Sequence, residues 1–482
     1  MMSSSYAQNF TSVGVGNYHR TQSVLVSPSL SGYSKYNWHV NLAGGWANVN
    51  NNYLALRVPY SLYRAPNRIP EQYLMDDGNP EFEREWIYED LNGRRKHISA
   101  GAHVLGPSFS FNVGNLSIGM FTQAQAGARV VGVSENLAHA VYNEFDSAQG
   151  AFRFFNPIGS GRNNEVEDLN ITVHSHAAVG LNLAYKIPMK HDRFLIPGIS
   201  LKRAFGFAGA SIQTEDVVFN TNFRDTVFVE PTSMSLKYWG EEETATTWGI
   251  DLGFTYVFNR KIYKRNRPYT KNKTLYHSKI SLAILDMGSF LYDEAYQSSI
   301  NLNNQLAFNT DSFDLDINEN NYPEVLDSLV SIYVTYQERV GRLKVGLPTR
   351  LVLSSDFQLR PQFFVSATLT QSLRRRRSEH MRHQNTLMVA PRWESPYFEV
   401  STPLLWAYDY RAFRLGLSAR LGPLYLGTNS LLPFLYTRGF RDLDIFAGIA
   451  FGNIPNFGVL SWLEQRHEKR VARRKAKGCA TF

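Results

Sequence analysis

The chain has 482 residues and a formal net charge of +8, and its composition excludes several classes of protein. No segment approaches the roughly 18 consecutive apolar residues that a membrane-spanning helix needs. The single cysteine, Cys479, excludes an internal disulfide framework and a cysteine-rich metal site. Basic residues gather in 374–377 and after Glu464 without a nucleic-acid-binding motif, so we expect no nucleic-acid partner.

The N-terminal residues lack the apolar core of a complete signal peptide. Ser5, Tyr6 and Ala7, followed by Gln8, are typical of the end of one, so we expect the mature chain to begin near Gln8. An ordinary polar N-terminus is the alternative. We assign residues 1–31 to a leader remnant and a Ser/Gly-rich segment that either plugs a barrel or forms a disordered lead-in.

From Trp38 onward, strand-like segments follow one another. Successive side chains of a strand point to opposite faces. In residues 171–187, apolar side chains alternate with polar ones such as Thr172 and Asn182, and residues 350–359, 413–422 and 443–452 repeat the pattern. Segments of about ten residues with this period are typical of transmembrane β-barrels. The other candidate strands before Arg350 are 38–49, 53–63, 97–104, 109–113, 116–122, 195–207, 225–229, 248–258, 278–286 and 332–340.

The connections between the last strands alternate in length. Tight turns at 360–361, 395–396 and 422–423 alternate with long links at 374–385 and 428–441 and a medium one at 409–410. Outer-membrane barrels have short periplasmic turns and longer external loops. Because the ends alternate from one strand to the next, the last strand ends at Gly452 on the short-turn, periplasmic side. A soluble β-sandwich has no reason to keep such an alternation.

We therefore predict an all-β protein, a closed antiparallel transmembrane β-barrel of about 14 strands that spans residues 32–453 in a bacterial outer membrane. Long polar insertions interrupt it at 142–168, 260–273 and 301–321, and residues 454–482 form a basic periplasmic helix or tail. Its expected surroundings are outer-membrane lipid and lipopolysaccharide. A soluble all-β binding protein, with apolar faces packed between two sheets, is the alternative.

Ionisable residues on the polar strand faces are the candidates for lining the lumen. A charge facing lipid would cost about 2–4 kcal/mol at the midplane, so we expect inward ion pairs. Two imidazoles on one strand face could bind a metal with a third ligand, but we prefer a lumen lining and predict no metal and no cofactor. Nucleophile elbows, phosphate loops and paired-carboxylate motifs do not stand out, so we predict no enzyme. The candidates are His174, His176, Asp251, Asp356, Arg414 and Arg420.

Two basic clusters are candidates for binding an anion or a protein partner. The first lies in an expected loop and would contact lipopolysaccharide or a partner's acidic surface, with a solvated loop as the alternative. The second follows Trp462 in the tail, where a disordered tail is the alternative. The candidate residues are Arg374, Arg375, Arg376, Arg377, Arg470, Arg473 and Arg474.

Five stretches carry a resemblance: Gly249–Tyr256, Ile280–Gly288, Leu347–Leu351, Pro391–Glu394 and Phe413–Leu424. Together they resemble a family of outer-membrane barrels of uncharacterised function in Bacteroidota. That family is similar to FadL-type fatty acid transporters and to PorV-type barrels of type IX secretion. The resemblance implies an at least partly plugged barrel of about fourteen strands. It implies either an accessory partner of a type IX secretion-related assembly or a channel for a small hydrophobic molecule.

Overall fold

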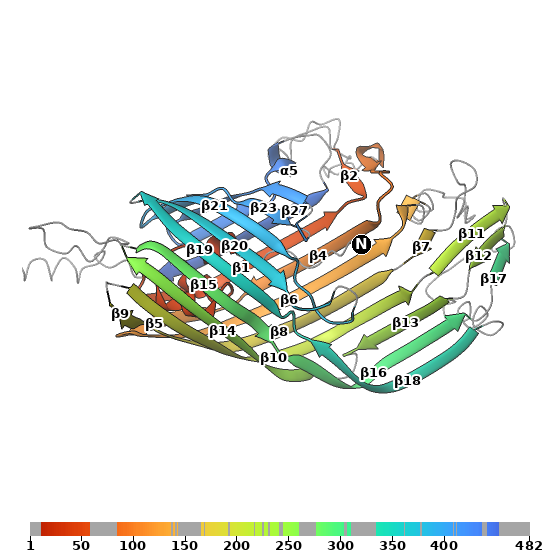
Figure 1. The fold of residues 1–482 in the computed structure, drawn as a ribbon, viewed down its shortest axis with the longest axis horizontal. Helices are drawn as coiled ribbons and strands as arrows, with labels where there is room; N and C mark the ends of the chain where they lie inside the picture. The colour runs from red at the N-terminus through yellow and green to blue at the C-terminus, as the bar shows by residue number, and fades with distance from the viewer. Residues whose placement is uncertain are drawn as a thin grey trace, which may run out of the picture.

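The structure of the chain, a computed structural model, is built almost entirely from β-strands (Figure 1). One sheet contains 21 strand segments, and several of them continue one another across short interruptions. The structure describes residues 11–57, 84–135, 138–139, 142, 165–167, 169–190, 193–215, 217–223, 226–229, 232–240, 244–259, 276–302, 306–309, 334–360, 362–375, 378–407, 409–410, 412–435 and 441–452.

Counted together with their continuations, these segments form a closed barrel of 14 antiparallel strands. In chain order they are β1 (Trp38–Asn51), β4 with β5 (Lys96–Leu105, Ser108–Val113), β6 (Leu116–Val133), β8 with β9 (Asn170–Tyr185, Ile187–Met189), β10 (Arg193–Glu215), β13 with β14 (Thr232–Trp239, Ala245–Asn259), β15 with β16 (Tyr276–Met287, Ser289–Leu302), β18 with β19 (Val334–Gly346, Arg350–Arg360), β20 (Phe363–Ser372), β21 (Thr386–Glu394), β22 with β23 (Phe398–Ser401, Leu404–Ala407), β24 with β25 (Ala412–Leu415, Leu417–Leu421), β26 (Leu424–Thr428) and β27 (Asp442–Gly452).

The barrel closes between its first and last strands. β27 pairs with β1 from His39↔Gly452 to Asn50↔Asp442. On its other side, β1 pairs with β4 and β5. Closure gives both strands backbone partners on both sides, so no edge remains at the junction. The predicted closed antiparallel barrel of about 14 strands is therefore confirmed.

Side chains alternate between the outer surface and the interior of the barrel. On β8, Val179 and Leu181 are exposed, whereas His176 and Asn182 are buried. On β27, Ile445 is exposed, whereas Asp444 and Phe446 are buried. The apolar faces therefore lie on the outside of one closed sheet. This arrangement differs from a β-sandwich, in which apolar faces meet in a dry interior.

The ends of the barrel differ in the length of their connections. Two- or three-residue turns join β19 to β20, β21 to β22, and β25 to β26 at one end, which we call the short-turn end. Longer connections join β20 to β21 and β26 to β27 at the other, the long-loop end. The predicted alternation is confirmed, and Trp38 and Gly452 both lie at the short-turn end. Gly422, with φ +60°, allows the tight β25–β26 turn.

Several elements lie outside the barrel strands. β2 (Leu54–Leu56) pairs with β3 (Ile87–Glu89), and β7 (Glu165–Glu167), β11 (Val217–Phe223), β12 (Thr226–Val229) and β17 (Leu306–Asn309) form a four-stranded sheet. The expected barrel strands 53–63 and 225–229 were thus wrong in their placement, because periodicity does not reveal a strand's partner. Residues 58–63 lie outside the described part, as does the predicted extension 454–482. The short helices η3 and α5 cover Arg84–Trp86 and Leu432–Leu435.

No helix among the residues that the structure describes is long and apolar enough to cross a membrane.

At the long-loop end, the sheet continues past the closed barrel on one side only. β13, β16 and β18 form this extension, at the lower right of Figure 1. β19 pairs with β15 and with β20. Its continuation β18 pairs with β16 but, among the described residues, with no second strand. The interruption at 347–349, which contains Pro348, therefore marks the point where the closed barrel becomes an open sheet.

Candidate functional site: the plugged lumen

Residues 11–37, which we call the plug segment, precede β1 and fill the lumen from the short-turn end. The segment contains α1 (Thr11–Gly14), α2 (Arg20–Ser23) and the 3-10 helix η1 (Pro28–Gly32). Residues 13–31 are buried apart from the half-buried Leu25. Helices this short leave most of their backbone polar groups without internal partners. The polar inner faces of the strands therefore supply many of the contacts that hold the plug segment.

Arg20 connects the plug segment to the barrel wall. Its side chain is buried, and its guanidinium N–H groups donate hydrogen bonds to five acceptors. Burial lowers the pKa of Arg20 to about 10, so the group stays charged at neutral pH. It donates to Ser110 Oγ (2.8 Å), Tyr36 O (3.0 Å), Asn37 O (2.9 Å), Ser117 Oγ (2.6 Å) and Asn112 Oδ1.

Two glycines of the wall make room for η1. A Cβ atom added to Gly198 would lie 2.4 Å from the backbone nitrogen of Ser29, and one added to Gly253 would lie 2.4 Å from Ser27 Oγ. Glycine permits this close approach because it has no side chain. Ser29 Oγ also lies 2.7 Å from Thr255 Oγ1. The backbone of η1 therefore packs directly against the backbone of the strands at these two glycines.

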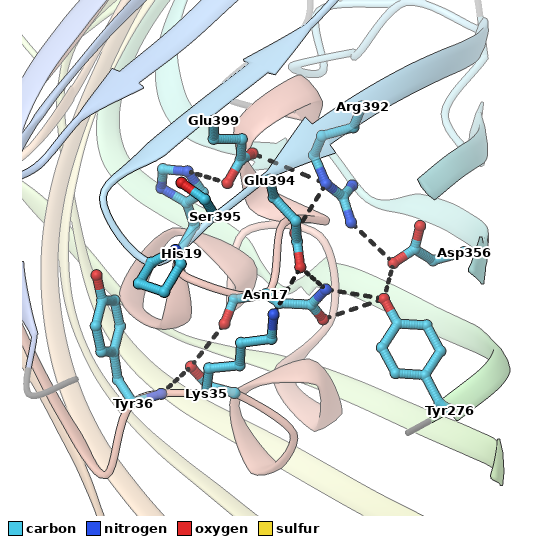
Figure 2. Close-up of polar contacts among 12 residues, drawn as sticks. Asn17, His19, Lys35, Tyr36, Tyr276, Asp356, Arg392, Glu394, Ser395 and Glu399 are labelled. Carbon is cyan, nitrogen blue, oxygen red and sulfur yellow. Dashed lines mark hydrogen bonds and ion pairs between the residues drawn. The ribbon is translucent and has the colours of Figure 1, made fainter. Parts of the chain in front are cut away.

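A buried charge network lies where the plug segment meets β21 (Figure 2). Arg392 is at its centre, with Nη2 3.0 Å from Asp356 Oδ2 and Nε 3.1 Å from Glu394 Oε2. Arg392 and Glu394 are two residues apart, so both point inward from the same strand. Asp356 also accepts a hydrogen bond from the hydroxyl of Tyr276 (2.6 Å). Each of these buried charges therefore has an opposite charge or a hydrogen-bond donor beside it.

Side chains of the plug segment complete this network. Asn17 Nδ2 donates to Glu394 Oε1 (2.6 Å), and Lys35 Nζ lies 3.1 Å from the same oxygen. His19 Nε2 lies 3.4 Å from Glu399 Oε2. Figure 2 shows these groups converging on the carboxylates of the wall. Withdrawal of the plug segment would leave two buried carboxylates with fewer partners.

A second charge cluster links four barrel strands beside the interruption at 347–349. Lys202 Nζ lies 2.7 Å from Asp251 Oδ1, and Asp286 pairs with both Lys202 and Arg350. Two positive and two negative charges thus balance one another. Arg350 Nη2 also lies 3.4 Å from Leu25 O of the plug segment. Through Arg350, the cluster therefore connects the residues beside the interruption at 347–349 to the plug segment.

The connection between β20 and β21 packs inward from the long-loop end. Met381 N donates to Gly346 O (3.2 Å), and Arg382 Nη2 lies 3.1 Å from Asp409 Oδ1. Burial, together with the nearby Arg350, holds the pKa of His383 well below its usual value. A cavity of about 10 Å³, enough for one water molecule, lies next to His383. Packed residues therefore occupy the lumen from both ends.

The structure places the lumen candidates as follows. All six are buried on the inner side of the wall. Asp356 and Arg420 belong to the network around Arg392, and Asp251 belongs to the second cluster. Arg414 Nε lies 2.5 Å from Asp442 Oδ2. The rings of His174 and His176 stack at 6.1 Å, and no group of three side chains suited to a metal occurs among the described residues.

The basic candidates are placed only in part. Arg374 donates to the backbone oxygens of Leu347 (2.9 Å) and Gly288 (3.0 Å), and Arg375 is exposed. The others lie outside the described residues: Arg376, Arg377, Arg470, Arg473 and Arg474.

Sequence reasoning missed the residues that hold the plug segment. Alternation along β21 could have indicated Arg392 and Glu394, since both fall on the polar face. Arg20 and Asn17 gave no signal, because they lie in a polar segment without periodicity. Their role depends on where that segment docks.

We expect Gly198→Val to displace η1, because the new side chain would overlap the backbone of Ser29. The measurement is the rate at which Leu30→Cys, in a Cys479→Ser background, reacts with a water-soluble maleimide. The rate should rise at least tenfold. Gly45→Val is the matched control, since a Cβ there meets no atom within 4 Å. Equal rates in the two variants would show that the glycine does not hold the plug segment in place.

Arg392→Met should lower the free energy of unfolding by about 3–5 kcal/mol, because it leaves buried carboxylates without their cation. Arg193→Met is the control. Its guanidinium is exposed, with a 3.5 Å contact to Tyr256, and its loss should cost no more than about 0.5 kcal/mol. Urea unfolding in lipid vesicles measures both. Adding Asp356→Asn to Arg392→Met should recover part of the loss. Strict additivity would argue against a coupled network.

Comparison with solved structures finds proteins of low sequence identity. The toluene transporter TodX of P. putida shares 9% identity, with 93% of this chain and 99% of that chain covered and a TM-score of 0.43. The Ralstonia pickettii toluene transporter TbuX shares 11% identity, with 92% and 97% covered and a TM-score of 0.40. A Pseudomonas aeruginosa FadL homologue shares 11% identity, with 93% and 98% covered and a TM-score of 0.39.

No curated protein matches the chain. A family model matches residues 28–429, which is most of the chain and includes η1 and nearly all of the barrel. The chain therefore belongs to the family described as "Family of unknown function (DUF5723)".

Proposed function

We propose that this protein is a plugged outer-membrane β-barrel that acts as a partner protein within an outer-membrane assembly. The observation that carries the proposal is the occupied lumen, in which the plug segment completes a buried charge network. A barrel with a filled interior leaves its loops and outer surface for function. The type IX secretion-related assembly that the sequence resemblance implies is the specific assembly that we propose.

The distribution of side chains supports a place in the membrane. Leucines and valines form the outer face, while ionisable groups such as Asp356 and Arg392 are buried inside. Lipid tails cannot hydrogen-bond to a backbone, so strands cross a bilayer only as a closed barrel. Apolar residues outside and polar residues inside are the pattern of outer-membrane barrels.

The contacts of the plug segment favour a partner role over a channel. To open the lumen, the segment would have to withdraw Arg20 from its hydrogen bonds and Lys35 from Glu394. Breaking a buried ion pair by removal of one partner costs about 3–5 kcal/mol. Several such contacts would break together, which makes an open lumen costly.

A channel for a small hydrophobic molecule is the second candidate, and one observation favours it. Beside the unpartnered side of β18, the inner wall carries a buried apolar cluster that includes Trp239, Phe290 and Val345. An apolar molecule could leave through the wall there without passage through the plug. The two candidates differ in whether anything crosses the barrel.

Arginine substitutions at two depths of β8 test the membrane placement. Val179→Arg, near the middle of the exposed apolar face, should cost about 2–4 kcal/mol of folding free energy in lipid. Tyr185→Arg, at the strand end, should cost only about 0–1 kcal/mol. Folding into lipid vesicles against urea measures the difference. Equal costs at both positions would contradict the proposed placement.

Two measurements on the full chain separate the candidate functions. The purified barrel in a planar bilayer should carry no steady ion current, and vesicles that contain it should take up an apolar dye no faster than empty vesicles. Capture of the tagged chain from native membranes should recover a stable partner. If the dye enters the vesicles rapidly and the captured chain elutes without a partner, the partner role is wrong and the channel role is supported.

A further inference from the structure

We infer that the free edge of β18 is a docking site for an extended, acidic polypeptide segment, which adds a strand to the sheet extension. The inference rests on the proposed partner role, and it names the surface and the chemistry of the partner. Its starting point is the incomplete pairing of β18 described above.

The backbone of β18 offers a long template. β18 pairs with β16 from Val334↔Leu302 to Gly346↔Ser289. Within the described chain, its other edge has no strand beside it. Only Gly346 at its C-terminal end is covered, since Gly346 N donates to His380 Nδ1 and Met381 N donates to Gly346 O, so residues 334–345 form the free edge. Exposed edges are usually short, or are blunted by proline, bulges or charged side chains, because unpaired N–H and C=O groups attract another strand. β18 spans 13 residues and contains no proline, although its register with β16 shifts between Tyr292 and Ala295. Its basic side chains would repel most strands, so an added strand has to carry acidic side chains.

One face of β18 is held in place by the core. Leu343 and Val345 are buried in a cluster with Phe290 and Tyr292. The strand is therefore already ordered without a partner, and docking would cost little ordering of this chain. Val340 is 64% exposed, so no described part of this chain covers it.

The surroundings of the edge are basic. Arg339, Arg342 and Lys344 of β18 are exposed. Arg374 is held against the base of the strand by its bonds to Leu347 and Gly288, and the exposed Arg375 follows it. Lys237 completes the group, which we call the basic edge.

Few acidic groups offset the basic edge. Arg342 Nε lies 2.9 Å from Asp293, and Lys237 Nζ lies 3.8 Å from Glu379. Burial lowers the pKa of the adjacent His380; Glu379 opposes this shift, while Arg374, Lys237 and Lys344 add to it. Among the described side chains, two of these six cations form an ion pair with a carboxylate, and the surplus of positive charge complements an acidic partner.

A polypeptide explains this surface better than a lipid headgroup does. Lipopolysaccharide phosphates would neutralise the cations but leave the backbone of β18 unpaired. An acidic strand satisfies both, since its backbone completes the ladder and its alternate side chains reach Arg342 and Lys344.

The test uses a fluorescein-labelled 12-residue peptide of alternating glutamate and valine or threonine, added to the full chain in detergent micelles. Fluorescence anisotropy measures affinity. We expect Arg339→Glu combined with Arg342→Glu and Lys344→Glu to weaken binding at least tenfold. Lys190→Glu combined with Arg193→Glu is the control, because these exposed cations lie at the short-turn end. The control should change the affinity less than twofold.

A second peptide separates strand addition from simple charge attraction. The same acidic sequence, N-methylated on alternate residues, keeps its charge but cannot form the ladder. It should bind at least tenfold more weakly, and only the unmethylated peptide should slow hydrogen exchange in residues 334–345. Equal binding of both peptides would overturn the proposal. Binding of lipid A micelles that depends on the same arginines, without peptide binding, would assign the surface to lipid phosphate and also overturn it.

Failure here is distinguishable from failure of the proposed function. If native membranes still yield a partner and the triple glutamate variant captures it undiminished, the partner role stands and the edge site is wrong. If the peptides behave as expected but membranes yield no partner, the edge site stands and the assembly role fails.

Discussion

The buried pairing between the plug segment and the inner carboxylates is the interaction on which the closed lumen depends. Burial of a charge is costly unless hydrogen bonds and opposite charges replace the lost water. Arg392, Asp356 and Glu394 meet that requirement on the wall itself, and Asn17 and Lys35 complete it from the plug segment. The wall and the plug segment therefore each stabilise the charges of the other.

Glycines and polar residues hold the plug segment in different ways, by close packing and by hydrogen bonds. Gly198 and Gly253 let η1 approach the strands at backbone distance. Arg20 then binds hydroxyl and carbonyl groups of the wall and of the segment itself. Close packing alone would not orient such short helices, and hydrogen bonds alone would not exclude water. Together they give a single docked position.

The barrel is asymmetric at its long-loop end, and this asymmetry connects the lumen to the outer surface. The interruption at 347–349 ends the closed part of the wall beside the cluster of Lys202, Asp286 and Arg350. Arg350 touches the plug segment, while the next residues lead to the free edge of β18. Only residues 346–349 would thus separate a partner bound to that edge from Arg350, which contacts the plug segment.

Period-two alternation was enough to predict most of the barrel strands and their outward face, because these are local properties of a pleated chain. It did not predict β13 and β16, and it wrongly placed 53–63 and 225–229 in the barrel. The lengths of the last connections predicted the end at which each of those lies. Alternation also placed His174, Asp251 and Arg420 on the polar face. Only the folded chain shows which strands are neighbours, since pairing joins segments far apart, such as β1 and β27. The network of Asn17 with Glu394 could not be predicted, because the two residues are 377 positions apart and the docking of the plug segment has no periodic signature.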